Sequence, residues 1–485
     1  MIKEYKKMIK FGTGGWRAII GEDFTKANIQ IFASAMAAKM KAEGADKKGI
    51  VMGYDRRFLS KETVIWCCEV FAAQGIPCYF VCRSVPTPLI MNYVGKYDFP
   101  YGMMVTASHN PSLYNGIKVF TAGGRDADET QTGEIEAYIS QVDEKRIETM
   151  EYAAAVKAGL VTEFYPMNEY IDDIMAKIDM EAIKRAQLRV VLDPMYGVGK
   201  TALNTILTSG RCDIEIIHQE HDTLFGHRMP APSAERLGLL KHCVVDGGYD
   251  MGLAMDGDAD RLGVIDENGR YLHPNDILVL LYYYLLRYKG WKGPVIRNLA
   301  TTHRLDAIAQ KYGQTCYEVP VGFKHISAGI ARHGAILGGE SSGGLTVAGH
   351  INGKDGVYAA SLLVEMVAVT GKRLSELMEE IRQECPDAYM DEQPYTLRED
   401  VKKQLQHLLF VEKVLPEMKP YEIERVSYMD GCKIYLKGGG WVIARFSGTE
   451  PLLRVFGEMP EQEEAKRVCA CFKTMIDALN KDAES

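Results

Sequence analysis

Three aspartates, Asp256, Asp258 and Asp260, occupy alternate positions in the segment Met255-Asp-Gly-Asp-Ala-Asp-Arg261. Carboxylates this close in sequence repel one another strongly unless a cation compensates their charge. Carboxylate oxygens are the ligands that hard divalent cations such as Mg²⁺ and Ca²⁺ prefer. The spacing therefore favours a divalent metal site over a solvated acidic turn.

A calcium loop of the EF-hand type also carries acidic residues at its first, third and fifth positions. That loop needs Gly at its sixth position, where this sequence has Arg261, and Glu267 at the twelfth position does not compensate. The apolar residues 251–255 and 262–265 on either side are typical of short strands rather than helices. We therefore expect the three acids in a strand-to-strand loop.

A second segment, Met103-Met-Val-Thr-Ala-Ser-His-Asn-Pro111, predicts an apolar strand that ends in a polar turn. Ser108 lies near the tip of this turn, where an open approach would let its hydroxyl accept a phosphoryl group in line. Taken alone, a serine in a turn more often bonds its own backbone. The G-x-S-x-G motif is absent here, which disfavours a Ser-His-acid esterase.

Two further loops could bind parts of a substrate. In Gly338-Gly-Glu-Ser-Ser-Gly-Gly344, Glu340 and Ser342 could bond sugar hydroxyls, although a flexible hairpin turn is an equal explanation of the glycines. In the segment from Arg445 to Arg454, two guanidinium groups bracket Ser447, Gly448 and Thr449 and could clamp a phosphate. The alternative there is a helix cap, since Ser447 and Glu450 have capping-box spacing.

The composition bounds the classes of protein that these loops can belong to. A chain of 485 residues predicts about three domains at roughly 150 residues each, and four are also possible. Hydrophobic residues make up 47% and charged residues 25%, as in ordinary globular proteins. The net charge of −8, from 57 basic and 65 acidic residues, argues against binding to nucleic acid or anionic lipid. An anionic ligand would have to be held by local Lys and Arg.

The location of the protein follows from its cysteines and apolar runs. The 11 cysteines are scattered without C-x-x-C spacing, which is typical of reduced thiols in a cytoplasm. The longest apolar run, Ile277 to Leu286, is too short for a membrane span and predicts a buried helix. The first residues lack the apolar core of a secretion signal. We therefore expect a cytoplasmic protein that does not bind membranes.

The elements that position these loops alternate between helix and strand. Apolar residues at helical spacing predict helices over 25–41, over 60–74 with Ser60 as a cap, and over 302–312. Strands are expected over 51–54, 76–82, 189–193 and 293–297, so the fold class is α/β. Residues 426–429, 432–436 and 441–445 predict short strands before a helix over 461–479. Polar boundaries then divide the chain into domains over 1–160, 161–269, 270–387 and 388–485.

Taken together, the loops resemble those of the α-D-phosphohexomutase family, which includes phosphoglucomutases, phosphomannomutases and phosphoglucosamine mutases. The matching segments occur in the order of the family and cover nearly the whole chain. They are Phe11-Gly-Thr-Gly-Gly-Trp-Arg17, Thr106-Ala-Ser-His-Asn-Pro111, Asp256-Gly-Asp-Ala-Asp-Arg261, Gly339-Glu-Ser-Ser-Gly343 and Arg445-Phe-Ser-Gly-Thr-Glu-Pro451. The resemblance implies three similar α/β domains and a smaller α+β phosphate-binding domain, arranged around a central cleft.

The resemblance also implies a reaction. Ser108 would carry a phosphoryl group, and Mg²⁺ would be held by Asp256, Asp258, Asp260 and an oxygen of the phosphoserine. The group would pass to a hexose phosphate, giving a hexose 1,6-bisphosphate such as glucose 1,6-bisphosphate. This intermediate would turn end over end and return its other phosphate to the serine. Hexose 1-phosphate and hexose 6-phosphate would interconvert in two transfers.

Further roles follow from the same match. Arg445, Ser447, Gly448 and Thr449 would clamp the far phosphate, and Glu340 and Ser342 would read the sugar. Gly322, Lys324 and His325 resemble another specificity loop, although a surface lysine is the simpler explanation of Lys324. Lys118 and Arg17 align with basic residues near the phosphoserine, Arg261 would balance charge beside the metal, and His109 adjoins the nucleophile. Ala18 stands where many relatives have Gly.

The sugar is predicted from two positions. Relatives that use glucosamine phosphate commonly have Gln where this chain has Ser341. These relatives and the dual-specificity mannose enzymes commonly have a His where this chain has Gly344. This difference favours glucose phosphates, although His350 could replace the missing histidine. The alternatives are a phosphomannomutase, a phosphoglucosamine mutase, a Mg²⁺-dependent sugar phosphatase or a sugar-phosphate-binding protein without catalysis. We expect small-molecule sugar phosphates as partners, no nucleic acid or membrane, and a monomer or homodimer.

Overall fold

The computed structural model describes residues 9–12, 15–446 and 452–482 of the chain. Two compact units are present, Met1–Ile277 with Ser342–Leu377, and Leu278–Ser341 with Met378–Ser485. The chain passes from the first unit to the second within α10 (Pro274–Arg287). No helix of the described ranges is long and apolar enough to cross a bilayer.

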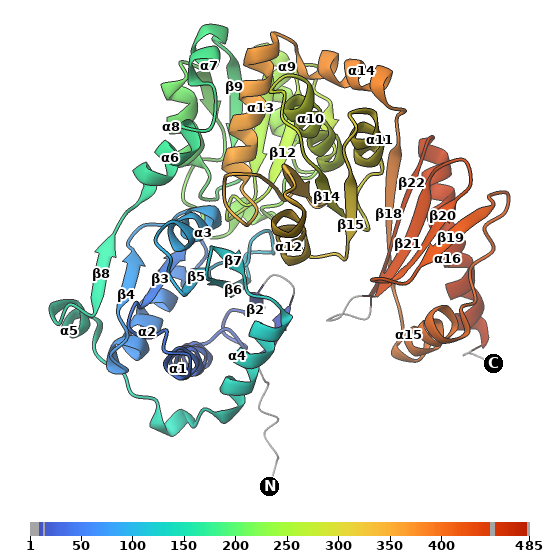
Figure 1. Cartoon of the computed structure of the whole chain (residues 1–485). Coiled ribbons are helices and arrows are strands. Elements are labelled where there is room, and N and C mark those ends of the chain that lie inside the picture. The colour runs from blue at the N-terminus through green and yellow to red at the C-terminus, as the bar shows by residue number, and fades with distance from the viewer. Residues whose placement is uncertain (1–8, 13–14, 447–451, 483–485) are drawn as a thin grey trace. The chain divides into compact units, whose positions relative to one another are not determined.

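The first unit begins with a mixed sheet in the order β1-β2-β6-β5-β3-β4-β8, with β7 paired to β6. Figure 1 shows this sheet in blue and cyan. Its strands are β1 (Phe11–Gly12), β2 (Gly15–Ile19), β3 (Ile50–Tyr54), β4 (Cys78–Val81), β5 (Tyr101–Val105), β6 (Tyr114–Thr121), β7 (Arg125–Asp126) and β8 (Val161–Phe164). β3 pairs in parallel with β4 and β5, and β5 pairs antiparallel with β6. The parallel pairs arise from the helix–strand alternation that the sequence predicts.

Helices cover both faces of this sheet. Ile50 and Met52 of β3 belong to one apolar core with α1 (Lys26–Ala42) and α2 (Ser60–Ala73). On the other face, a Cβ added to Gly53 would lie 2.5 Å from Ile90 of α3 (Thr87–Lys96), so glycine lets this helix approach the strand closely. The further helices are α4 (Glu129–Gln141), η1 (Glu144–Arg146) and α5 (Tyr152–Lys157).

The second sheet of this unit has the order β10-β9-β11-β12-β13. Its strands are β9 (Arg189–Asp193), β10 (Asp213–Ile216), β11 (Met251–Met255), β12 (Leu262–Asp266) and β13 (Tyr271–Leu272). β11 pairs in parallel with β9 and antiparallel with β12, and every residue of β11 and β12 is buried. The loop with the three aspartates therefore joins two fully buried strands, as the sequence predicts. The surrounding helices are α6 (Met167–Met175), α7 (Met180–Ala186), α8 (Lys200–Ser209), η2 (Phe225–His227) and α9 (Gly238–Gly247). β17 (Leu345–Val347) and α13 (Gly356–Thr370) complete the unit.

The second unit contains parallel strands and an antiparallel sheet. β14 (Val295–Asn298) lies in parallel between β15 (Cys316–Val319) and β16 (Leu337–Gly339), with α11 (Arg304–Lys311), α12 (Phe323–His333) and α14 (Leu374–Glu384) as helices. The antiparallel sheet has the order β18-β22-β21-β20-β19 (orange and red in Figure 1). It comprises β18 (Tyr389–Thr396), β19 (Ile423–Ser427), β20 (Cys432–Leu436), β21 (Trp441–Phe446) and β22 (Leu452–Met459), with α15 (Glu399–Gln406), η3 (His407–Glu412) and α16 (Gln462–Asp482). The predicted α/β class with a smaller α+β domain is confirmed.

Some local predictions are wrong. Ser60 is the first residue of α2 rather than its cap, because Leu59 occupies the cap position and the Ser60 hydroxyl donates to Asp55 Oδ1 instead. β19 ends at Ser427, so the strand predicted over 426–429 lies too far along the chain. β18 and β22 are absent from the predicted elements although they pair along their whole length. β18 has no buried residue, and the alternating buried positions of β22 are interrupted by Gly457 and the buried Glu458, so neither shows a clear apolar period.

Candidate active site

Ser108 lies just beyond β5 in a turn with left-handed backbone geometry, with φ at 52°. Its backbone N–H donates to Thr106 Oγ1 at 2.8 Å, and its hydroxyl donates to Asp256 Oδ2 at 2.9 Å. A left-handed backbone is strained for a serine and persists only where the surroundings impose it. The structure thus places the predicted phosphoryl acceptor directly against the predicted metal loop.

Arg57, to which no sequence motif assigns a role, holds this turn. Its guanidinium donates to four backbone carbonyls, those of Ser108 at 2.7 Å, Asn110 at 2.7 Å, Pro111 at 2.9 Å and Tyr114 at 3.0 Å. The planar fork of an arginine suits this task because it presents several donors in a fixed geometry. A lysine could not reproduce this set of bonds.

The guanidinium of Arg57 is itself held by Asp55, at the end of β3. Arg57 Nε lies 3.4 Å from Asp55 Oδ2, and both side chains are fully buried. The other oxygen of Asp55 accepts the backbone N–H of Arg57 at 3.0 Å, and Thr106 Oγ1 donates to Oδ2 at 2.6 Å. An acidic residue directly after an apolar strand was the only signal in the sequence that could have pointed to this pair.

Asp256, Asp258 and Asp260 are all buried, and one carboxylate oxygen of each lies within 4.8 Å of the others. Asp256 Oδ1 accepts the backbone N–H groups of Asp260 and Arg261, each at 3.0 Å. Oδ1 of Asp258 and Oδ1 of Asp260 are buried without a hydrogen-bond partner in the described part of the chain. Unsatisfied buried carboxylate oxygens are costly, and oxygen ligands are those that Mg²⁺ prefers, so these residues fit the predicted ion.

Two lysines neutralise part of this negative charge. Lys118 Nζ lies 2.6 Å from Asp258 Oδ2 and 2.8 Å from Asp260 Oδ2, and Lys354 Nζ lies 3.1 Å from Asp260 Oδ2. Burial disfavours the charge on Asp260, but the ammonium groups outweigh burial and hold its pKa well below the usual range. For Asp256, burial and the charge of Asp258 raise the pKa well above its usual value. Lys354 was not predicted, because it is far from the other residues in sequence.

Arg17 and His109 flank the serine turn. Arg17 Nη1 donates to Asn110 Oδ1 at 2.7 Å, and His109 Nδ1 lies 3.5 Å from Ser108 Oγ. Burial and the charges of Arg261 and Arg17 lower the pKa of His109 to about 2. The imidazole is therefore neutral at physiological pH, which makes it unsuited to donating a proton to a leaving serine oxygen.

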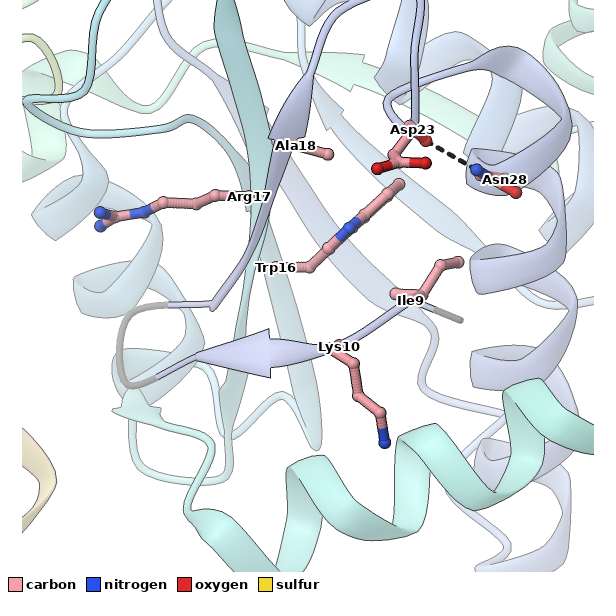
Figure 2. A pocket seen from close by; sticks show the side chains of 7 residues that line it. All are labelled: Ile9, Lys10, Trp16, Arg17, Ala18, Asp23 and Asn28. Carbon is pink, nitrogen blue, oxygen red and sulfur yellow. Dashed lines mark hydrogen bonds between the residues drawn. The ribbon is translucent and has the colours of Figure 1, made fainter. Parts of the chain in front are cut away.

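A cavity of about 230 Å³ lies beside β2, with Arg17 among the residues that line it (Figure 2). The Arg17 side chain extends to the opposite side of the strand from Trp16, as expected from the alternation of neighbouring residues. Asn28 Nδ2 donates to the carbonyl of Asp23 at 2.7 Å on the Trp16 side. The guanidinium of Arg17 thus points away from the cluster of side chains around Trp16.

The later part of the glycine-rich loop lies beside the metal loop. Arg261 forms a β-bridge with Gly344, and the backbone N–H of Gly356 donates to the carbonyl of Ala259 at 3.1 Å. Ser342 is exposed. His350, the predicted replacement for the missing sugar-binding histidine, has a fully buried side chain whose Nε2 lies 2.6 Å from Asp355 Oδ2, and its role stays a prediction.

The remaining predicted ligands belong to the second unit. Glu340 Oε1 accepts Asn298 Nδ2 and the backbone N–H of Gly322, both at 3.1 Å. Lys324 and His325 are half-buried in the first turn of α12, and Arg445 is half-buried near the end of β21. Ser447, Gly448 and Thr449 lie outside the described residues. The structure therefore groups the predicted residues into two sets, one in each unit.

This fold is that of the phosphosugar mutases. The chain is 30% identical over 459 residues to a phosphoglucomutase/phosphomannomutase of Thermococcus kodakarensis, covering 94% of this chain and 96% of the relative. It is 34% identical over 453 residues to a probable phosphoglucosamine mutase of Methanosarcina barkeri, covering 93% and 95%. A crystal structure from Thermus thermophilus, assigned as a phosphomannomutase, aligns with a TM-score of 0.83 at 27% identity, covering 97% of this chain and 99% of that one.

Family models match along the same length. They are those of phosphoglucomutase/phosphomannomutase α/β/α domain I over residues 8–146, domain II over 168–269, domain III over 273–385 and the C-terminal domain over 397–474. The chain belongs to the phosphoglucomutase/phosphomannomutase family. The expected family, the four-domain organisation and the class of enzyme, a phosphotransferase isomerase, are confirmed. The domain boundaries at 160, 269 and 387 and the arrangement around a cleft stay predictions.

Proposed function

We propose that this chain interconverts hexose 1-phosphate and hexose 6-phosphate through a phosphorylated Ser108 and a hexose 1,6-bisphosphate. The contact between Ser108 Oγ and Asp256, beside two buried carboxylate oxygens that make no hydrogen bond within the described residues, is the observation that carries the proposal. A serine on a strained, firmly held turn is well placed to donate and accept a phosphoryl group in line.

In the first transfer, a hexose hydroxyl oxygen forms a bond to phosphorus while the bond from phosphorus to Ser108 Oγ breaks; the hydroxyl gives up its proton and Ser108 Oγ gains one. In the second transfer, Ser108 Oγ loses its proton and bonds to phosphorus while the bond from phosphorus to the hexose oxygen breaks, and that oxygen gains a proton. Arg57 keeps Ser108 in position through the carbonyl bonds, and Lys118 keeps a positive charge beside Asp258 and Asp260. The reverse transfer uses the other phosphate of the bisphosphate.

We propose Mg²⁺ as the cation of the site, held by Asp256, Asp258 and Asp260 with an oxygen of phosphorylated Ser108. When bound, this cation would supply charge compensation for the phosphoryl group in transit. Arg261, whose side chain lies 3.8 Å from Asp260 Oδ1, would adjust the charge at the edge of the loop. Glucose 1,6-bisphosphate would activate the enzyme by phosphorylating Ser108.

The range of possible hexose substrates is wider than the loop residues Ser341 and Gly344 suggest. Two of the relatives reported above are named as a phosphoglucomutase/phosphomannomutase and a probable phosphoglucosamine mutase. These names support a phosphomannomutase or phosphoglucosamine mutase better than an enzyme restricted to glucose. We therefore propose a phosphohexomutase whose substrate is among the phosphates of glucose, mannose and glucosamine. The cytoplasmic location and the monomer or homodimer remain predictions from the sequence.

A coupled assay with the three hexose 1-phosphates, with and without the matching 1,6-bisphosphate, tests the proposal. Ser108→Ala should lose at least about a thousand-fold in kcat, because the acceptor oxygen is removed. Ser112→Ala, in the same loop between β5 and β6, serves as the matched control and should retain activity. Intact mass should show one phosphoryl group on the wild type and none on Ser108→Ala.

Other outcomes would favour other functions. Inorganic phosphate released from the sugars without isomerisation would indicate a phosphatase. Binding without turnover by the wild type would indicate a sugar-phosphate-binding protein. Activity of Ser108→Ala within ten-fold of the wild type would rule out the phosphoserine.

A further inference from the structure

Two consecutive backbone amides in the second unit bind two carboxylates that are far apart in sequence. The N–H of Val321 donates to Asp430 Oδ2 at 2.9 Å, and the N–H of Gly322 donates to Glu340 Oε1 at 3.1 Å. Glu340 is the predicted sugar-reading residue, whereas Asp430 has no predicted role. Val321 and Gly322 therefore connect Asp430 to the loop of residues 338–344, which contains Glu340 and is called the sugar loop below.

The second partner of Asp430 is Arg445, the first residue of the predicted phosphate clamp. Arg445 Nη2 lies 2.9 Å from Asp430 Oδ2 and 3.1 Å from Asp430 Oδ1. Arg445 Nε is buried and has no hydrogen-bond partner among the described residues. Asp430 thus holds one edge of the guanidinium, while a buried donor on it makes no bond to the described protein.

The backbone around Asp430 is shaped to bring it against Arg445. Asp430 lies in the turn between β19 and β20, and the next residue, Gly431, has a φ of 109°. A Cβ added to Gly431 would lie 2.6 Å from the carbonyl oxygen of Ala444 and 2.8 Å from Arg445 Cγ. Only glycine permits this close approach of the turn to the stem of the arginine.

The elements on both sides of Asp430 are packed together by an apolar core within the same unit. This core contains Leu299 and Ala300 together with Tyr435, Trp441 and Ile443, and Val321 packs against it. The contact from Asp430 to Val321 therefore joins two segments that this core already holds together. A bond made on a fixed framework orients its partner more effectively than one on a mobile loop.

We propose that Asp430 is a positioning residue that fixes the Arg445 guanidinium for substrate phosphate and sets it in register with the sugar loop through Val321 and Gly322. The proposal rests on the proposed function of the site. Asp430 contacts the backbone of Val321 and the guanidinium of Arg445, and its effect passes through these two residues.

Charge and positioning make opposite predictions for Asp430, which allows a sharp test. If the carboxylate acted on the substrate by charge alone, its removal would tighten phosphate binding, because a like charge would be lost. If it acts by positioning, its removal must weaken binding, because the Arg445 side chain would then have to be ordered by the substrate itself. Asp430→Asn separates the two effects, since the amide oxygen still accepts hydrogen bonds without carrying charge.

The experiment compares steady-state kinetics of the full-length wild type, Asp430→Ala and Asp430→Asn on the preferred hexose 1-phosphate. Asp430→Ala should raise KM about ten-fold and change kcat less than about three-fold, and Asp430→Asn should keep KM within about three-fold of the wild type. Asp400→Ala is the matched control, because Asp400 pairs with Arg398 at 2.6 Å on the surface of α15. It should leave both constants unchanged.

A double variant tests whether Asp430 acts through Arg445. Asp430→Ala combined with Arg445→Ala should have the same KM as Arg445→Ala alone, because the positioned group is already gone. Fully additive increases in KM, or an unchanged or lower KM in Asp430→Ala, would overturn the proposal. Thermal unfolding of each variant verifies the fold, and Asp430→Asn provides the comparison if Asp430→Ala is unstable.

Failure of the proposed function has a different signature. A wild type that isomerises none of the three hexose phosphates would refute that function without testing Asp430. Calorimetric titration with glucose 1,6-bisphosphate would then measure the role of Asp430 directly. An affinity that falls about ten-fold in Asp430→Ala but not in Asp430→Asn supports the positioning role, and equal affinities in all three proteins contradict it.

Discussion

The chemistry of the candidate site depends on how buried charges compensate one another at the level of single residues. Lys118 contacts both Asp258 and Asp260, and it is buried with them. A buried charge without its partner destabilises a protein strongly. Either a lysine ammonium group or a bound metal cation can compensate the charge of a buried carboxylate. Lys118 and a divalent cation should therefore contribute overlapping stabilisation to the same two aspartates.

Lys118→Met tests this overlap. In chelator, the variant should lose about 3–5 kcal/mol of unfolding free energy, because two buried carboxylates lose an ion-pair partner. Added Mg²⁺ should raise the unfolding temperature of Lys118→Met by more than that of the wild type. Lys96→Met, which removes a partly exposed pair with Asp173 at 3.0 Å, is the control and should cost at most about 1 kcal/mol. Equal increments with Mg²⁺ in both proteins would show that the lysine and the cation act independently.

At the scale of elements, the first residues of α13 pack against the backbone of the metal loop. The side chain of Asp355 caps this helix by accepting the N–H groups of Val357 and Tyr358, each at 2.9 Å. The first helical residue, Gly356, touches the loop so closely that an added Cβ would lie 2.7 Å from the carbonyl oxygen of Arg261 and 3.0 Å from that of Ala259. The position of the three aspartates thus depends on a glycine in a different part of the chain.

Gly356→Ala should weaken Mg²⁺ binding and cost about 1–3 kcal/mol of stability, since the new methyl group displaces the loop backbone. The matched control is Gly133→Ala in α4, where no atom lies within 4 Å of the added Cβ. That change should stabilise the protein by about 0.5–1 kcal/mol through helix propensity. Calorimetric Mg²⁺ titration and chemical denaturation measure both effects. Unaltered Mg²⁺ affinity in Gly356→Ala would mean that the loop does not depend on this helix.

At the scale of the whole molecule, the two units contain different titratable networks. In the second unit, Lys433 Nζ is buried and bonds the carbonyl of Leu299, Glu318 Oε2 and His303 Nε2, at 2.7, 2.7 and 3.0 Å. Burial, together with the charge of Arg297, lowers the pKa of Lys433 to about 7. Between about pH 7 and the ordinary lysine pKa of 10.5, Lys433 is therefore protonated in the unfolded chain and deprotonated in the folded unit.

This difference predicts that the unfolding free energy of the second unit rises with pH over that window, because the unfolded state holds the extra proton. Lys433→Met should lose this rise. Tryptophans report the units separately, since Trp16 and Trp66 lie in the first unit and Trp291 and Trp441 in the second. In variants that keep only one of these two tryptophan pairs, chemical denaturation followed by tryptophan fluorescence at pH 7 to 9 measures the unfolding free energy of each unit. The same pH slope with and without Lys433 would contradict the assignment.

Much of the fold could be predicted because it depends on local patterns. Alternating helices and strands, such as α1 followed by β3, show apolar periods that a short window of sequence contains. β18 and β22 could not be found in this way, because one edge and one inner strand of an antiparallel sheet are defined by their pairing rather than by their own periodicity. The misplaced cap at Ser60 has a similar cause, since its hydroxyl is used by Asp55 in another element.

The sequence by itself determined the chemical groups: the alternating aspartates, the serine turn and the arginine and glutamate loops are each continuous segments whose residue types limit the reaction. Only the tertiary structure decided which distant side chains support them. Arg57 reaches the serine turn, Lys354 reaches Asp260, and Asp430 reaches Arg445. Such contacts depend on how strands and helices pack after the chain has closed long loops, and no local spacing of residues encodes that packing.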